Sequence, residues 1–98
     1  MDIADWRKKI DEIDRRLVHS LNERARCVAE IGKIKRENGI PILESHREEE
    51  VLRHAIEANK GPLENTAIGR LFEAIVRESR ELQQKLFEKE DRERGQKP

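Results

Sequence analysis

Hydrophobic residues recur every three or four positions along most of the chain, which is the spacing of one face of an α-helix. The first run starts at Ile3 and continues through Trp6, Ile10, Ile13, Leu17, Leu21, Val28 and Ile31. Asn38-Gly39 followed by Pro41 ends it, because Gly adopts the left-handed cap conformation and Pro cannot extend the hydrogen-bond ladder. The pattern predicts one long helix over residues 3–37.

Two further helices follow. Ser45 and Glu48 have the capping-box spacing, and the apolar stripe behind them stops at residues 59–62, which predicts a helix over about 44–59. Asn65 as an N-cap, followed by apolar residues at helical spacing, predicts a third helix over about 64–89. No strand-like alternation is visible, so the predicted class is all-α, with one long, one short and one medium helix. We expect a domain of residues 1–90 and a disordered charged tail of residues 91–98.

The first helix is long for a chain of 98 residues. At about 1.5 Å per residue it would extend roughly 50 Å, whereas a compact chain of this size has a radius of gyration of about 13 Å. Much of the helix must therefore project beyond the other two, and its apolar stripe needs a cover. A second copy related by two-fold symmetry carries the same stripe, so we predict an intertwined homodimeric helical bundle.

Charge and composition exclude several classes of partner. The chain has 21 Lys and Arg against 21 Asp and Glu, so no overall field attracts nucleic acid or an anionic membrane. Two Phe, one Trp and no Tyr are too few for base stacking. The single Cys27 cannot form an internal disulfide, and we interpret it as a small buried hydrophobic residue. Without a signal peptide or a membrane-spanning run, a cytoplasmic location is expected.

Polar residues interrupt the apolar stripes. Continuing the first stripe in steps of three and four places Arg24 and Lys35 on it. Burying an unpaired cation costs several kcal/mol, so each requires an anion. An internal salt bridge or a bound ligand could supply the anion. A side chain that extends to water would not need one. On the third helix the stripe carries Ser79, with Gln83 one turn further, and both can donate hydrogen bonds.

Arg47 and Glu48 lie at the edge of the apolar face of the second helix. Glu48 has two equal interpretations, as the third residue of the capping box or as a ligand-binding carboxylate. Together with Arg24, Lys35, Ser79 and Gln83, these residues suit a small polyanion with a hydroxyl group. They include no nucleophile paired with a base, no metal-ligand spacing and no Gly-rich phosphate loop. We therefore predict neither a metal nor a cofactor.

Over about residues 6–84, the order and spacing of several motifs resemble the all-helical (type II) chorismate mutases. The motifs are Arg7–Asp14 with Leu17, Glu23-Arg24, Gly32–Lys35, Pro41-Ile42, Arg47-Glu48 and Ser79–Gln83. The resemblance implies an isomerase of the shikimate pathway that converts chorismate to prephenate in aromatic amino-acid (Phe and Tyr) biosynthesis. It also implies a homodimer with shared active sites and no cofactor.

The resemblance assigns a role to each residue. Arg7 of the partner subunit, Arg24 and Arg47 would hold the two substrate carboxylates, with Ser79 assisting. Lys35 and Gln83 would donate hydrogen bonds to the ether oxygen, and Glu48 would accept one from the ring hydroxyl. Glu44 aligns with a position that is often Asp in relatives and is included among the binding residues. Lys35, Gln83 and Arg24 are thus the catalytic candidates.

Two other functions stay open at this point. An isochorismate-pyruvate lyase on the same scaffold would use much the same cations. A non-enzymatic helical adapter would have inward cations that are all paired internally, and it would gain no stability from a dicarboxylate ligand.

Overall fold

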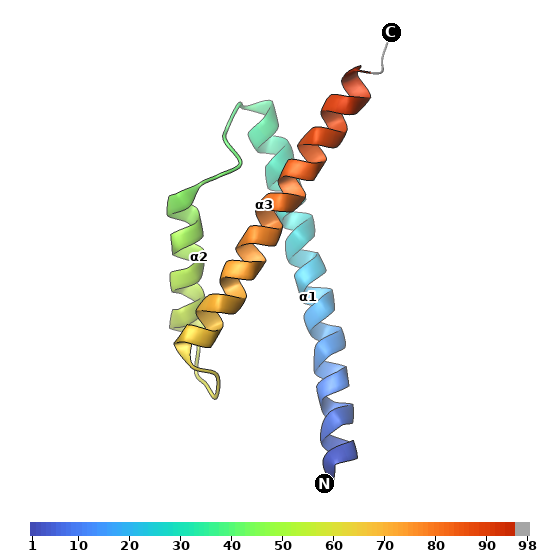
Figure 1. Ribbon diagram of the computed structural model, residues 1–98, viewed down its shortest axis with the longest axis vertical. Helices are drawn as coiled ribbons and strands as arrows, with labels where there is room; N and C mark the ends of the chain where they lie inside the picture. The colour runs from blue at the N-terminus through green and yellow to red at the C-terminus, as the bar shows by residue number, and fades with distance from the viewer. Residues whose placement is uncertain (96–98) are drawn as a thin grey trace.

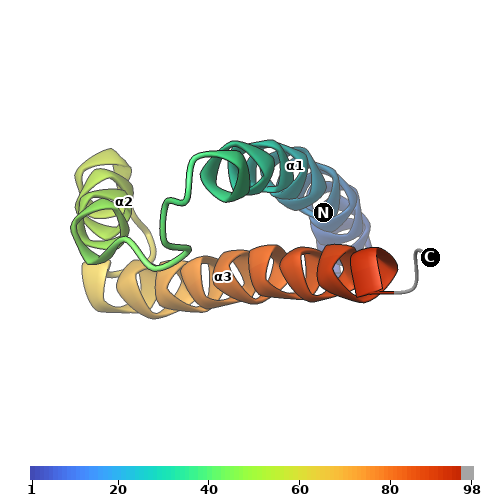
Figure 2. The ribbon, with the colours of Figure 1, turned by 90° about the horizontal axis from the view of Figure 1, so that it is seen from above.

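The computed structural model describes residues 1–95 and contains three helices, α1 (Ile3–Glu37), α2 (Ser45–Ala58) and α3 (Asn65–Gly95). α3 packs against both α1 and α2. Figure 1 shows α3 crossing α1 while α2 runs beside the first part of α3. Seen from above, α1 and α2 lie on the same side of α3 (Figure 2). The predicted all-α, three-helix class is confirmed.

α1 and α3 run in the same direction, which gives their contacts a constant sequence offset. Arg24 bonds to Ser79, and Gln83 bonds to Val28, in each case across 55 residues. Residues one turn apart on α1 therefore meet residues one turn apart on α3. This offset brings the polar positions of the two stripes together.

Both ends of α1 are capped by local sequence. At the start, the Asp2 carboxylate accepts from the Asp5 N–H at 2.9 Å, and the Asp5 carboxylate accepts from the Asp2 N–H at 3.1 Å. At the end, Gly39 has a φ of 64°, and the Ile40 N–H donates to the Lys35 carbonyl at 2.8 Å. A left-handed Gly with this hydrogen bond is the Schellman motif. The predicted bounds of α1 are confirmed.

The start of α2 differs from the prediction. Glu44 occupies the N-cap position, no side chain caps the helix, and Ser45 is the first helical residue. The predicted capping box between Ser45 and Glu48 is therefore wrong. The Glu48 carboxylate lies 2.8 Å from Nε of Arg80 on α3. A carboxylate interacts more strongly with a guanidinium cation than with a neutral backbone amide.

α3 continues to Gly95, so the predicted end near residue 89 is wrong. Arg36 of α1 contacts this extension. Its Nε lies 2.9 Å from the Glu90 carboxylate, it bonds to Asp91, and its guanidinium lies 5.0 Å from the centroid of the Phe87 ring. These contacts support a helical turn that has no apolar stripe of its own. The separation of residues 1–90 from 91–98 stays a prediction, and residues 96–98 lie outside the described residues.

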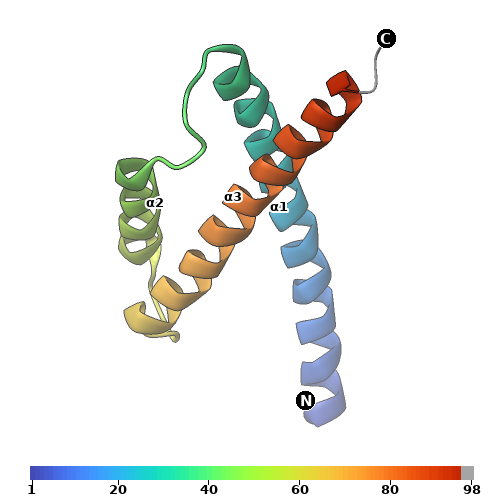
Figure 3. The same ribbon diagram turned by 45° about the horizontal axis from the view of Figure 1, so that its top comes forward.

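The single chain is elongated and buries little. Its radius of gyration is 17.6 Å, compared with about 13 Å for a compact chain of this length. Figures 1 and 3 show the N-terminal half of α1 extending away from the other helices. The apolar residues of that half are exposed, namely Ile3, Trp6, Ile10, Ile13, Leu17 and Val18. The predicted overhang of α1 is confirmed.

Two further sequence predictions are tested by the fold. Cys27 is exposed, so its interpretation as a buried residue is wrong. Among residues 1–95, no helix has both the length and the hydrophobicity needed to cross a bilayer.

Candidate active site

A cavity of about 140 Å³ lies between the three helices. α1 forms one wall, the beginning of α2 and the segment before it form another, and the middle of α3 forms the third. The cavity is lined by four cationic side chains and two carboxylates, a surplus of two positive charges. These six residues are Arg24, Lys35, Arg47, Arg80, Glu44 and Glu48. A concave site with this charge balance favours a dianion.

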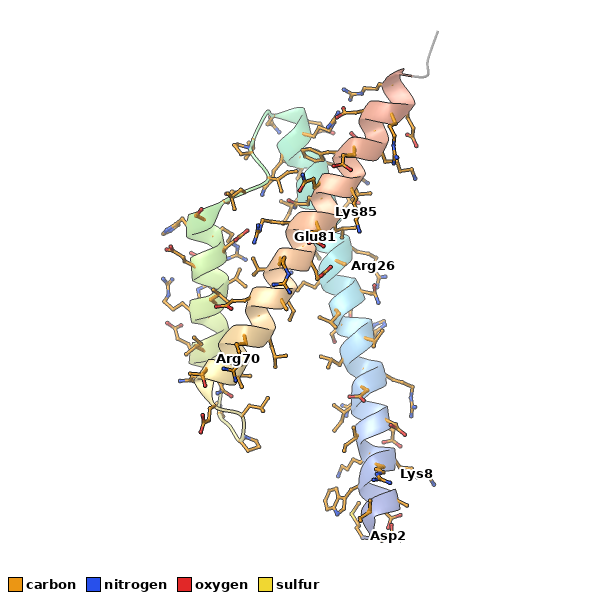
Figure 4. The ribbon with its side chains drawn as sticks, in the orientation of Figure 1. Asp2, Lys8, Arg26, Arg70, Glu81 and Lys85 are labelled. Atoms are coloured by element: carbon orange, nitrogen blue, oxygen red, sulfur yellow. The ribbon has the colours of Figure 1, made fainter. Side chains whose placement is uncertain are left out.

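Seven of the eight predicted site residues line this cavity, namely Arg24, Lys35, Glu44, Arg47, Glu48, Ser79 and Gln83. The eighth, Arg7, does not line it and is exposed near the start of α1. Figure 4 labels its neighbour Lys8, close to the free end of α1 and with neither α2 nor α3 beside it. Within one chain, Arg7 is therefore separate from the other seven.

Lys35 is 8% exposed, although it carries a charge. Its Nζ donates to the Ile42 carbonyl at 2.9 Å and lies 2.8 Å from a Glu44 carboxylate oxygen. The internal salt bridge considered for Lys35 therefore exists, and the same side chain also lines the cavity. An ammonium group has three N–H donors, so these two contacts leave one direction for a ligand.

Arg24 reaches from α1 to α3. Its Nη1 donates to Ser79 Oγ at 2.6 Å, and the Ser79 hydroxyl donates to the Ile75 carbonyl at 2.8 Å. Within residues 1–95 no carboxylate forms an ion pair with Arg24, so its charge has no internal counterion there. This arrangement fits the ligand-binding interpretation of Arg24 and not the internal salt bridge.

Gln83 is 5% exposed, and its Nε2 donates to the Val28 carbonyl at 2.9 Å. Gly32 makes room for it, since a Cβ at position 32 would lie 3.2 Å from Gln83 Cγ. Within residues 1–95 the second amide N–H of Gln83 has no hydrogen-bond partner, so it can donate to a ligand in the cavity. Gly32 was not among the predicted site residues, although a Gly inside a helix often marks a close approach.

The α2 wall differs from the sequence prediction. Arg47 is exposed and bonds to Glu50 on its own helix. That hydrogen bond and the Arg47 charge hold the pKa of the Glu50 carboxyl below its ordinary value. Arg47 is thus at the edge of the cavity, and Glu48 is held by Arg80, which sequence reasoning missed. The available signal was the position of Arg80 one turn after Val76 on the core side of α3.

A second, larger cavity of about 360 Å³ lies at the C-terminal ends of α1 and α3. It is lined by three cations and three carboxylates, namely Lys33, Arg36, Arg94, Glu37, Glu90 and Glu93. The signs balance, and Arg36 is already paired with Glu90. Among residues 1–95 no cluster of three or more His, Cys, Asp or Glu is arranged to bind a metal.

Several known proteins with similar sequences are named as a chorismate mutase or as a bifunctional enzyme that includes one. The chorismate mutase of Methanocaldococcus jannaschii is 30% identical over 87 residues, which is 88% of each chain. A bifunctional chorismate mutase/prephenate dehydratase of Stutzerimonas stutzeri is 38% identical over 85 residues, covering 82% of this chain and 23% of that protein. The chain therefore spans about a quarter of the length of such bifunctional relatives.

The fold and the family model agree with these sequences. The structure of chorismate mutase (form II) from Thermus thermophilus matches with a TM-score of 0.82 and 36% identity, covering 84% of this chain and 93% of that one. The model of the family "Chorismate mutase type II" matches residues 6–84, a segment that contains all eight predicted site residues. The chain belongs to the chorismate mutase type II family.

Proposed function

We propose that this chain is an isomerase that converts chorismate to prephenate in the shikimate pathway, for the biosynthesis of Phe and Tyr. The observation that carries the proposal is the cavity with a surplus of two positive charges, built around the buried ammonium group of Lys35. Chorismate has two carboxylates and a ring hydroxyl, which match this surplus and the Glu48 carboxylate. Membership of the family supports the assignment.

The reaction needs no base, nucleophile or cofactor. In one cyclic shift of electrons the ether C–O bond breaks and a C–C bond forms between the two ends of the allyl vinyl ether. Atoms and charge therefore balance within the substrate. The enzyme's first task is to select the compact, chair-like conformer in which these ends approach. We assign it to the cations that bind the carboxylates, Arg24 with Ser79, Arg47, and Arg7 of the partner subunit.

The second task is to stabilise the charge that grows on the ether oxygen as the C–O bond breaks. Lys35 and Gln83 donate to this oxygen in the proposal. Both are held before any substrate arrives, Lys35 by Ile42 and Glu44, and Gln83 by Val28. Donors fixed in this way favour the transition state over the ground state. Glu48 accepts from the ring hydroxyl, and Glu44 acts by orienting Lys35.

The site is completed in an intertwined homodimer. Residues 3–21 of α1 carry an exposed apolar stripe, and the same stripe of a second copy would cover it. The partner's Arg7 would then close the cavity and raise the positive surplus by one. This accounts for the position of Arg7, which is far from the other binding residues in its own chain.

Subunit mixing tests the shared site. Arg7→Ala and Lys35→Ala should each be nearly inactive. After subunit exchange at equal amounts, half of the dimers pair the two variants, and one of their two sites has neither defect. About a quarter of wild-type activity should return. No recovery in mixtures that do exchange subunits would show that Arg7 acts within its own chain or not at all.

A direct assay separates the proposal from its rivals. The purified chain should consume chorismate and form prephenate, whereas a lyase would release pyruvate from isochorismate, so pyruvate release is measured with that substrate. An adapter would do neither and would show no rise in unfolding temperature with a dicarboxylate ligand. The Arg24 guanidinium, which has no carboxylate partner within residues 1–95, favours a ligand-binding protein.

A further inference from the structure

Arg80 is a cation of the cavity that contacts Glu48. Its Nε lies 2.8 Å from Glu48 Oε2, and the pair connects α3 with the first turn of α2. We infer that Arg80 is a positioning residue, which holds the Glu48 carboxylate so that its other oxygen accepts a hydrogen bond from the substrate's ring hydroxyl. The inference rests on the proposed function and adds to it a residue that sets recognition of the hydroxyl.

The two carboxylate oxygens of Glu48 have different partners in this inference. A carboxylate has about four acceptor positions on its two oxygens. Arg80 contacts Oε2, so Oε1 is left for the hydroxyl. Arg47 does not compete for Glu48, because its guanidinium bonds to Glu50. Arg80 is thus the cation that determines where the carboxylate of Glu48 lies.

The position of Glu48 needs such support because nothing local supplies it. No side chain caps the start of α2, so Glu48 is not held by a capping box. A Glu side chain has many rotamers, and ordering it when the substrate binds would weaken binding. Contact with Arg80 orders the carboxylate in advance.

The geometry also predicts how the interaction tolerates change. Arg80 Nε is buried, and although it is close to Glu48 it forms no directed hydrogen bond. The contact is therefore an ion pair that depends on the positive charge of the side chain at position 80. A Lys at this position should keep part of the effect, and an uncharged side chain of similar length should lose it.

The test compares chorismate with an analogue in which hydrogen replaces the ring hydroxyl. For Arg80→Met we expect kcat/KM for chorismate to fall about tenfold, mainly through KM, and to change less than about threefold for the deoxy analogue. Arg80→Lys should give an intermediate loss that again depends on the hydroxyl. Because Arg80→Lys keeps the charge, it also preserves the test if Arg80→Met fails to fold.

Arg53→Met is the matched control. It removes the Arg53–Glu57 ion pair, which lies on α2 outside the cavity, and it should change neither substrate's kinetics. Equal losses with chorismate and the deoxy analogue in the Arg80 variants would overturn the inference, since Arg80 would then act on the carboxylates or on the fold. A wild-type chain that leaves chorismate unchanged would overturn the proposed function itself, and the inference with it.

Discussion

The two halves of α1 follow the same helical periodicity but are built differently. In the N-terminal half the stripe is apolar and exposed, with Trp6 53% and Leu17 54% accessible. In the C-terminal half the stripe contains charged residues, yet Lys35 is 8% exposed and Arg24 is partly buried. In a single chain, therefore, the apolar positions face solvent while a cation is sequestered.

This contrast in burial shows what each half of α1 requires. Lys35 can be buried because Ile42 and Glu44, from the segment after α1, accept from two of its three donors and Glu44 balances its charge. Nothing within the described part of the chain does the equivalent for the apolar half, since α3 diverges from it (Figure 1). In the proposed function, the C-terminal half of α1 is a prebuilt binding site, and the N-terminal half is a surface that a second copy would cover. Substitutions in the two halves should therefore fail in different ways.

The largest effect is expected from Leu17→Asp. In the proposed dimer the substitution occurs twice, and each copy removes apolar burial and places a carboxylate in the interface. Subunit affinity should fall by at least about 10³-fold, and activity should fall with it because Arg7 no longer reaches the other site. Sedimentation with parallel assays measures both. Arg15→Asp, on the opposite side of α1, is the control and should stay dimeric; a fully active monomeric Leu17→Asp would refute the shared site.

Lys35→Ala should lose activity without dissociation of the proposed dimer. Removing the proposed donor to the ether oxygen should lower kcat by about 10²- to 10³-fold, while the proposed dimer and its apolar interface should be unchanged. Lys33→Ala is the matched control, because Lys33 is two residues away, pairs with Glu30 at the surface and does not line the site. Steady-state kinetics measure the loss in kcat, and sedimentation shows whether the variant stays dimeric. If the two variants lost activity equally, the special position of Lys35 would be disproved.

Gln83→Glu should change the pH dependence of the reaction. Near neutral pH an ionised Glu cannot donate to the ether oxygen and repels its developing charge, so kcat should fall about 10²-fold. In acid the protonated carboxyl has one O–H donor, and activity should recover as pH decreases. Gln83→Met, which cannot donate at any pH, should stay slow throughout. A Gln83→Glu enzyme as fast as the wild type at neutral pH would show that Gln83 does not face the ether oxygen.

Much of the fold and part of the candidate site are encoded locally, which is why the sequence predicted them. The period of the apolar residues defines the helices, and Gly39 marks the end of α1 because the left-handed conformation favours that residue. Arg24 and Lys35 stood out because they occupy stripe positions. The family resemblance added Arg7 and Glu44, which no local pattern indicates.

The features that were missed depend on contacts between helices. Arg80 and Glu48 are 32 residues apart and meet only because α2 folds back along α3, which made the local capping box the wrong interpretation. The end of α3 was placed too early for the same reason, since Arg36 of α1 stabilises a segment without apolar periodicity. The contact between Arg36 and Asp91 follows the 55-residue offset between α1 and α3, and that offset depends on how α2 and its loops are arranged.

The smallest expected effect comes from Gly32→Ala, and it separates the geometry of the site from the stability of the helix. Replacing a Gly inside a helix with Ala usually adds stability, up to about 1 kcal/mol. At position 32 the new Cβ would lie 3.2 Å from Gln83 Cγ and would push that side chain by a few tenths of an ångström. A shift of the Gln83 amide should lower kcat about tenfold, while the unfolding temperature stays equal or rises. In Gly69→Ala the added Cβ meets nothing within 4 Å, so the same gain in stability should come without loss of activity. If both Ala variants kept full activity, the fit between Gly32 and Gln83 would not matter for catalysis.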